Sequence, residues 1–183
     1  MRKDLASCPP HTHTHTPLLH AQVPFVAGSY SAVAYDTTGA VVATHIRNTT
    51  GAAVALVASI RDMVGTTLYS GCNDYGLVEV KVVDINGQVV PDASNVVTLS
   101  ISGTPSAYIE GSGNGDPAGD YNNKLPAHPA YHGLMLGVIA AGDDVGTITI
   151  TATATGLTSS SVKMPVVDGT GLATKWCPNY PKW

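Results

Sequence analysis

The densest group of oxygen-bearing side chains in this sequence lies in the glycine-rich segment 110–123. Ca²⁺ takes about six to eight oxygen ligands, and four residues here could supply some of them: Glu110, Asn114, Asp116 and Asp120. Their spacing differs from the EF-hand pattern. Glycine also supplies the positive φ angles of tight turns, and Asn and Asp cap such turns. We therefore expect a long loop of turns here, with calcium binding or the shaping of a neighbouring cleft as alternative functions.

Cysteine, asparagine and histidine offer further chemistry at separate places. The three cysteines are Cys8, Cys72 and Cys177. A disulfide between Cys72 and Cys177 can form in an oxidising compartment, and free thiols are the alternative. Asn48 begins the tripeptide Asn-Thr-Thr, an N-glycosylation sequon. Histidines alternate with threonines at 11–16, a pattern that suits transition-metal chelation and equally a low-complexity leader without a role.

Composition excludes several classes of function. The chain has 183 residues, of which 44% are hydrophobic and 12% charged, so it can build a globular core. Its formal net charge of -4 argues against nucleic acid as a partner, because phosphate binding needs a basic surface. The longest apolar run, 52–58, is too short to cross a bilayer. Residues 1–3 include two basic side chains but no apolar stretch follows them, so no secretory signal is visible.

The residue types predict strands rather than helices. Val, Thr, Ala and Gly dominate, while Glu occurs only at Glu79 and Glu110. Helix surfaces normally carry many charged residues, whereas Val and Thr fit a pleated sheet. Segment 52–70 suits two short strands around a bend better than an apolar helix. Alternating runs predict a hairpin over 29–46 and further strands at 77–83, 96–101, 107–110, 134–139, 146–154 and 161–166.

About seven short strands separated by turns are typical of an Ig-like antiparallel β-sandwich. Pro165 cannot donate a ladder hydrogen bond, which predicts that the last strand lies at a sheet edge. We therefore expect an all-β protein with these segments: a disordered leader at 1–27, the hairpin and a linker at 28–50, the sandwich at 51–167 and a tail at 168–183.

Five segments taken together resemble one known domain. They are 80–91, 95–99, the Gly-Asn-Gly-Asp-Pro loop at 113–117, the Tyr-His-Gly-Leu stretch at 131–134, and 146–152. Their order and spacing are similar to those of the C-terminal Ig-like domain of family 2 glycoside hydrolases of the β-galactosidase type. The hairpin resembles the last two strands of the Ig-like domain that precedes it in such enzymes.

The resemblance implies a non-catalytic accessory domain, here as a fragment or separate chain that begins inside one accessory domain and completes the next. Its partners would be the catalytic barrel and other domains of a parent glycosidase, together with a carbohydrate, and the parent family favours an extracellular or secretory location. The family's barrel of about 250 residues uses two glutamates. Glu79 lies between two valines of a strand and Glu110 precedes a glycine-rich loop, so we assign no catalytic residue and no cofactor.

A free-standing carbohydrate-binding or adhesion module of the same fold is the alternative function. It would need a set of exposed, coplanar aromatic rings or an acidic metal cluster at one end of the sandwich. The aromatic candidates are Tyr121, Tyr131, Trp176, Tyr180 and Trp183. A gene fragment whose hairpin does not fold by itself is the third interpretation, since a lone hairpin is marginally stable in water.

Overall fold

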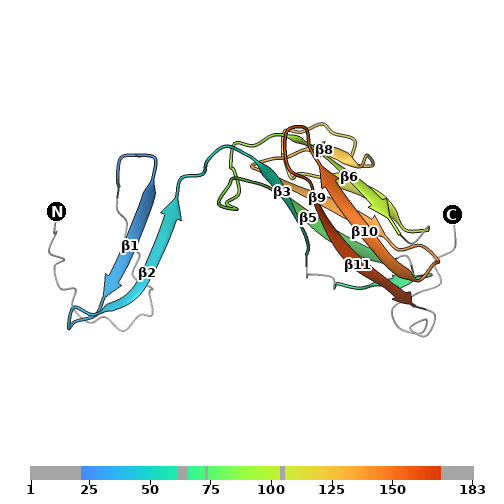
Figure 1. The fold of residues 1–183 in the computed structure, drawn as a ribbon, viewed down its shortest axis with the longest axis horizontal. Coiled ribbons are helices and arrows are strands. Elements are labelled where there is room, and N and C mark those ends of the chain that lie inside the picture. The colour runs from blue at the N-terminus through green and yellow to red at the C-terminus, as the bar shows by residue number, and fades with distance from the viewer. Residues whose placement is uncertain (1–21, 62–65, 73, 104–105, 170–183) are drawn as a thin grey trace. The chain divides into compact units, whose positions relative to one another are not determined.

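The computed structural model describes residues 22–61, 66–72, 74–103 and 106–169. Every element of this described part is a strand (Figure 1), which confirms the all-β prediction. The chain divides into two compact units, Met1–Thr49 and Thr50–Trp183.

The first unit contains a two-stranded antiparallel hairpin, formed by β1 (Ser29–Tyr35) and β2 (Val41–Asn48). Oδ1 of Asp36 accepts a hydrogen bond from the backbone N–H of Ala40 (2.9 Å) across the turn between them. Gly39 takes the positive φ of 87° that this turn requires. The sequence therefore closes the hairpin locally, without help from the second unit.

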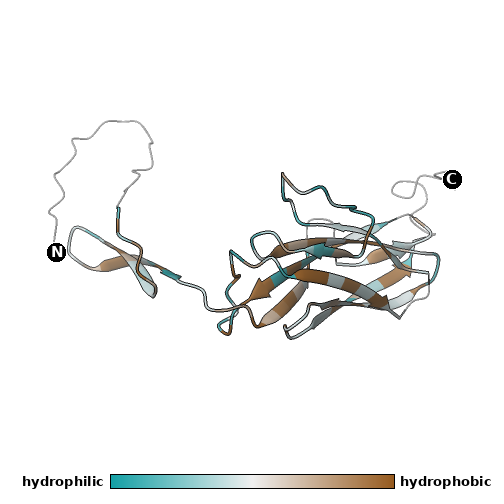
Figure 2. Ribbon diagram, turned by 90° about the horizontal axis from the view of Figure 1, so that it is seen from above, coloured by the Kyte–Doolittle hydropathy of each residue, from teal (hydrophilic) through white to brown (hydrophobic). Residues whose placement is uncertain are grey.

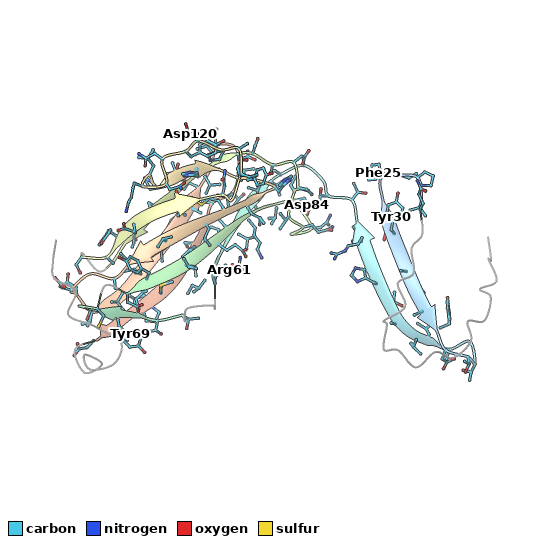
Figure 3. All side chains as sticks on the ribbon, turned by 180° about the vertical axis from the view of Figure 1, so that it is seen from behind. Phe25, Tyr30, Arg61, Tyr69, Asp84 and Asp120 are labelled. Atoms are coloured by element: carbon cyan, nitrogen blue, oxygen red, sulfur yellow. The ribbon has the colours of Figure 1, made fainter. Side chains whose placement is uncertain are left out.

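The hairpin leaves its apolar side chains in water. The hydroxyl of Tyr30 donates to the carbonyl oxygen of Val26 (2.9 Å), which ties the preceding segment to β1 (Figure 3). That contact covers little, because most large hydrophobic side chains of this unit are exposed: Val23, Phe25, Val26, Val33, Tyr35, Val41, Val42 and Ile46. A two-stranded unit has no second layer to bury them.

The second unit is a sandwich of two sheets (Figure 1). One sheet has the strand order β4-β11-β10-β6-β8 and the other β3-β5-β9-β7. Seven of these nine described strands have six to nine residues, and β4 and β8 have three each. The predicted Ig-like sandwich is confirmed: β3 and β4 are the two short strands expected within 52–70, and β8 is an addition. The strands are β3 (Ala55–Ile60), β4 (Leu68–Ser70), β5 (Tyr75–Val83), β6 (Val96–Ser102), β7 (Tyr108–Gly113), β8 (Ala127–Pro129), β9 (Leu134–Ala140), β10 (Gly146–Thr153) and β11 (Ser160–Asp168).

Strict alternation places small aliphatic side chains between the sheets. The inward residues of β5 and β10 are fully buried: Val78, Val80, Val82, Ile148, Ile150 and Ala152. Gly137 of β9 also faces inward, and a Cβ there would lie 2.3 Å from Cδ1 of Leu99, so the missing side chain makes room for a leucine of the opposite sheet. Figure 2 shows the hydrophobic colour concentrated along the strands of this unit.

The structure differs from the sequence prediction at three places. The long loop expected to start at 111 starts later, because β7 continues to Gly113. The expected loop is also followed by a strand that the pattern did not predict, β8 around His128. Three residues are too few for an alternating pattern to be visible.

The prediction that the last strand lies at a sheet edge is wrong. β11 pairs with β10 on one side and, in parallel, with β4 on the other, where Val166 lies opposite Leu68. Pro165 immediately precedes that parallel pairing. A proline at this point therefore removes no donor from the three residue pairs that join β11 to β4.

Asp84 joins the start of the sandwich to the turn after β5. Its side chain is 2% exposed, and Oδ2 accepts a hydrogen bond from the backbone N–H of Gly51 at 2.9 Å (Figure 3). Oδ1 accepts two more, from the N–H groups of Asn86 and Gln88, each at 2.9 Å. These bonds lower the pKa of Asp84, and the largest cause is the bond from Gly51, followed by that from Gln88.

Replacing one buried isoleucine should test the core. Ile148 is 0% exposed, so Ile148→Ala should lower the free energy of unfolding by about 2–5 kcal/mol through lost burial and a residual cavity. Urea denaturation measures the change. Ile85→Ala is the matched control, because Ile85 is 82% exposed and its loss should cost less than about 0.5 kcal/mol. Equal losses in the two variants would contradict the packing described above.

Asp84→Asn should lower the melting temperature by at least about 5 °C at pH 7, because one amide oxygen replaces a carboxylate that accepts three N–H groups. The folded-state pKa of Asp84 lies below the ordinary value of 3.8. Its stabilisation is therefore complete above about pH 4 and is lost as the pH falls through the folded-state pKa. The difference in melting temperature should shrink below about pH 4.

The exposed Asp92→Asn variant serves as the control in the same pH series and should melt like the parent protein throughout. If the difference in melting temperature between Asp84→Asn and the parent protein stays constant from pH 7 into the acid range, the charge of the carboxylate contributes nothing to stability.

Candidate functional site

A groove of about 660 Å³ crosses the outer face of the sheet β3-β5-β9-β7. Its floor comes from β9, whose outward side chains are Leu134, Leu136 and Val138. Its rims come from the end of β3, from β5, and from β7 with the loop that follows it. The remaining lining residues are Arg61, Glu79, Glu110, Gly111, Ser112, Gly113, Asn114, Gly115, Asn123, Lys124 and Met135.

A β-bulge in β7 shapes one rim of the groove. Ile109 pairs with Ile139 and Gly111 with Val138, so Glu110 is the extra residue and lines the groove. A Cβ on Gly111 would lie 2.2 Å from the carbonyl oxygen of Asn123. Glycine at 111 therefore lets the loop lie directly against β7.

Ion pairs occupy both rims. Glu79 binds two cations, Nη1 of Arg61 through Oε1 and Nζ of Lys81 through Oε2, each at 3.0 Å. On the other rim Glu110 is bound by Lys124. The hydrogen bond from Lys124 is the largest cause that lowers the pKa of Glu110. Figure 3 labels Arg61, which stands just beyond the end of β3.

The two glutamates share a groove but do not form a glycosidase carboxylate pair. β9 lies between their strands, so their backbones are two strand spacings apart, about 10 Å, and each carboxylate is bound by its own neighbouring cations. A catalytic acid also needs a raised pKa, and that of Glu110 is lowered. Their geometry makes Glu79 and Glu110 polar rim groups.

The predicted calcium residues have other partners in the structure. Oδ1 of Asn114 accepts from the N–H of Asp116 (3.0 Å), Oδ1 of Asp116 accepts from the N–H of Ala118 (2.9 Å), and Asp120 is exposed (Figure 3). These are turn-capping bonds. Within the described residues, no cluster of three or more His, Cys, Asp or Glu is placed to hold a metal ion. Calcium binding by Glu110, Asn114, Asp116 and Asp120 stays a prediction.

A buried serine–histidine contact anchors the same loop. The hydroxyl of Ser112 donates to the carbonyl oxygen of Leu125 (2.6 Å) and lies 3.0 Å from Nδ1 of His128. Since that hydroxyl has a single proton, Nδ1 must be the donor in the second bond. The ring of Tyr121 packs edge-on against His128, with ring centres 5.2 Å apart. The burial of His128 leaves no signal in the sequence, because this residue lies in a strand of only three residues.

The other predicted sites fall at separate places. Cys72 is disulfide-bonded, and Cys177 lies outside the described residues, so their pairing stays a prediction. Asn48 is exposed at the end of β2, and its glycosylation likewise stays a prediction. Tyr131 packs edge-on against His132. Also outside the described residues are the histidine run at 11–16, Cys8, Trp176, Tyr180 and Trp183.

Two exposed tyrosines beside the groove were missed from the sequence. Tyr75 of β5 and Tyr108 of β7 are both paired with Ala140 of β9, one on each side. Their side chains are 42% and 49% exposed, while Ala140 is 1% exposed. Only the strand register reveals that residues so far apart in the sequence face outward side by side.

A family model described as glycoside hydrolase family 2 C-terminal domain 5 matches residues 61–163. The chain is 33% identical, over 91 residues, to Beta-galactosidase BoGH2A of Bacteroides ovatus, and the match covers 50% of this chain and 10% of that protein. The chain therefore spans about a tenth of this curated relative.

Solved structures match over a larger part of the chain. A glycosyl hydrolase family 2 member from Bacteroides cellulosilyticus matches with a TM-score of 0.72 and 27% identity, over 80% of this chain and 18% of that one. A beta-glycosidase from Bacteroides vulgatus matches with a TM-score of 0.68 and 22% identity, over 79% and 18%. The second likeness concerns the fold alone.

Among the residues that the structure describes, no helix has the length and apolarity needed to cross a membrane.

Removing the Lys124 side chain should raise the pKa of one carboxyl group, that of Glu110. Lys124→Met removes the hydrogen bond and charge that lower the pKa of Glu110, so this pKa should rise toward its ordinary value of 4.5. Carbon-detected NMR titration of the glutamate carboxyl groups measures it. Lys163→Met is the control, because Lys163 lies on β11 in the opposite sheet. A Glu110 pKa that does not move in Lys124→Met would mean that the ion pair is absent in solution.

Proposed function

The chain belongs to the family of glycoside hydrolase family 2 C-terminal domain 5, and on this premise we propose that it serves a parent glycosidase as a structural domain beside the catalytic barrel. The observation that carries the proposal is the family match at 61–163, which runs from the end of β3 into β11. The matched segment is a non-catalytic accessory domain and a small part of its relatives. The barrel is therefore the partner that we propose.

The chemistry of the parent enzyme is proposed from its relatives. One of them is named a beta-galactosidase, which supports a parent that cleaves β-linked sugars. The chain's own glutamates favour a non-catalytic role for this domain, because each carboxylate is neutralised by a neighbouring cation. Catalysis would then take place outside this domain.

We propose that residues 28–50 are the terminal hairpin and linker of a preceding Ig-like domain, followed by the sandwich at 51–167 and a tail at 168–183. Two facts support this assignment of the hairpin. Its two strands pair with each other along their length, and it exposes an apolar surface that a second layer would cover. Further strands of that preceding Ig-like domain would supply the second layer.

The purified chain should not hydrolyse nitrophenyl β-galactoside or lactose, because both of its glutamates are ion-paired and the pKa of Glu110 is lowered, whereas a catalytic acid needs a raised pKa. The assay is release of nitrophenol or glucose over hours at high protein concentration. Glu79→Gln and Glu110→Gln identify the source of any trace activity. Turnover that survives purification and disappears in either variant would overturn the proposal, whereas turnover unchanged in both variants would belong to a contaminant.

A further inference from the structure

Two tyrosine rings form an exposed pair on the outer face of the sheet β3-β5-β9-β7. Tyr75 and Tyr108 flank Ala140 from the two neighbouring strands, so their backbones lie about 10 Å apart, at two strand spacings. The alternation along β5 turns Gly76 inward, where a Cβ would meet Met164, and therefore turns Tyr75 outward. Exposed tyrosine rings offer an apolar face together with a hydroxyl group.

The two rings and one ion pair belong to a single cluster. Besides burial, the negative charge of Glu110 helps to raise the pKa of Tyr108, which places the two side chains close together, and Glu110 is itself bound by Lys124. Burial raises the pKa of Tyr108, and the charge of Glu110 and the proximity of Tyr75 add to the rise. The cluster therefore adjoins the groove rim that contains Glu110 and Lys124.

The groove combines an apolar floor with ion-paired rim groups that can hydrogen-bond. The ionised side chains that line it are Arg61, Glu79, Glu110 and Lys124, whose charges sum to zero, and Lys81 binds Glu79 just outside the lining. Asn123 adds an amide group on the loop side, whereas the amide of Asn114 is bonded to Pro129 and Asp116. A volume of about 660 Å³ lies within the range of small-ligand sites, which typically have apolar walls and a few placed polar groups.

This chemistry fits a sugar chain better than a protein surface. A protein partner would have to strip water from both ion pairs, and charged residues are depleted at the centres of protein interfaces for that reason. Sugar hydroxyls replace that water with hydrogen bonds, while the C–H faces of sugar rings suit tyrosine rings and an aliphatic floor. A groove without net charge gives no advantage to an anionic ligand.

We propose that this groove binds a neutral oligosaccharide, with Tyr75 and Tyr108 each contacting a sugar ring and the rim side chains hydrogen-bonding its hydroxyls. The inference rests on the chemistry of the groove and takes from the proposed function only the choice of first probes. An accessory domain that binds no sugar would still be an accessory domain, so the two proposals fail separately.

The full 183-residue chain should be screened on an array of neutral β-linked galacto-, cello- and xylo-oligosaccharides, with oligogalacturonate as the anionic probe. Calorimetric titration of the best-bound probe then compares variants. Tyr75→Ala and Tyr108→Ala should each weaken binding by at least about fivefold, and Tyr75→Phe and Tyr108→Phe should keep most of the affinity because the rings remain. Tyr35→Ala is the control, an exposed tyrosine on β1 in the first unit.

Binding of a neutral probe that is weakened by both ring removals and unchanged in Tyr35→Ala would establish the site. Unchanged melting temperatures would show that the weaker variants are folded. Three results would each overturn the proposal: no neutral probe bound at millimolar concentration, binding indifferent to Tyr75→Ala and Tyr108→Ala, or a preference for oligogalacturonate. In the first case the outer face would be left for contact with another protein domain.

Discussion

The two-residue period of the strands is the constraint on which this molecule depends. Because Val78, Val80 and Val82 are buried against the opposite sheet, the side chains that alternate with them along β5 point to the outer face. Tyr75 and Glu79 must therefore face outward, and the same rule on β9 exposes the groove floor. The core thus determines the composition of the outer surface, although no residue of that surface contributes to the packing between the sheets.

The sequence was informative wherever alternation was long and local. The inward valines of β5 and the hairpin turn at Asp36 follow directly from pattern and turn chemistry. With only three residues, β8 is too short to show an alternating pattern and could not be predicted. The wrong edge assignment of the strand containing Pro165 has a different cause: a short strand was expected within 52–70, but its parallel pairing with β11 leaves no mark in the sequence.

Site residues were harder to predict than strands, because chemistry depends on register. The composition of the loop at 110–123 predicted a possible calcium site, yet its side-chain oxygens mainly close turns. Tyr75 and Tyr108 were not predicted as site residues, because only their common pairing with Ala140 brings them to one face. A bulge of one residue at Glu110 adds a further shift that no periodicity reveals.

The contact between Asp84 and Gly51 has a consequence for how this domain tolerates sequence change. Asp84 reads only the peptide N–H at position 51, and a Cβ added there would meet the carboxylate at an ordinary 3.7 Å. A Cβ is thus tolerated at position 51, whereas proline would remove the donated hydrogen. The segment leading into β3 is therefore held to the sandwich by a contact that does not require a particular side chain at position 51.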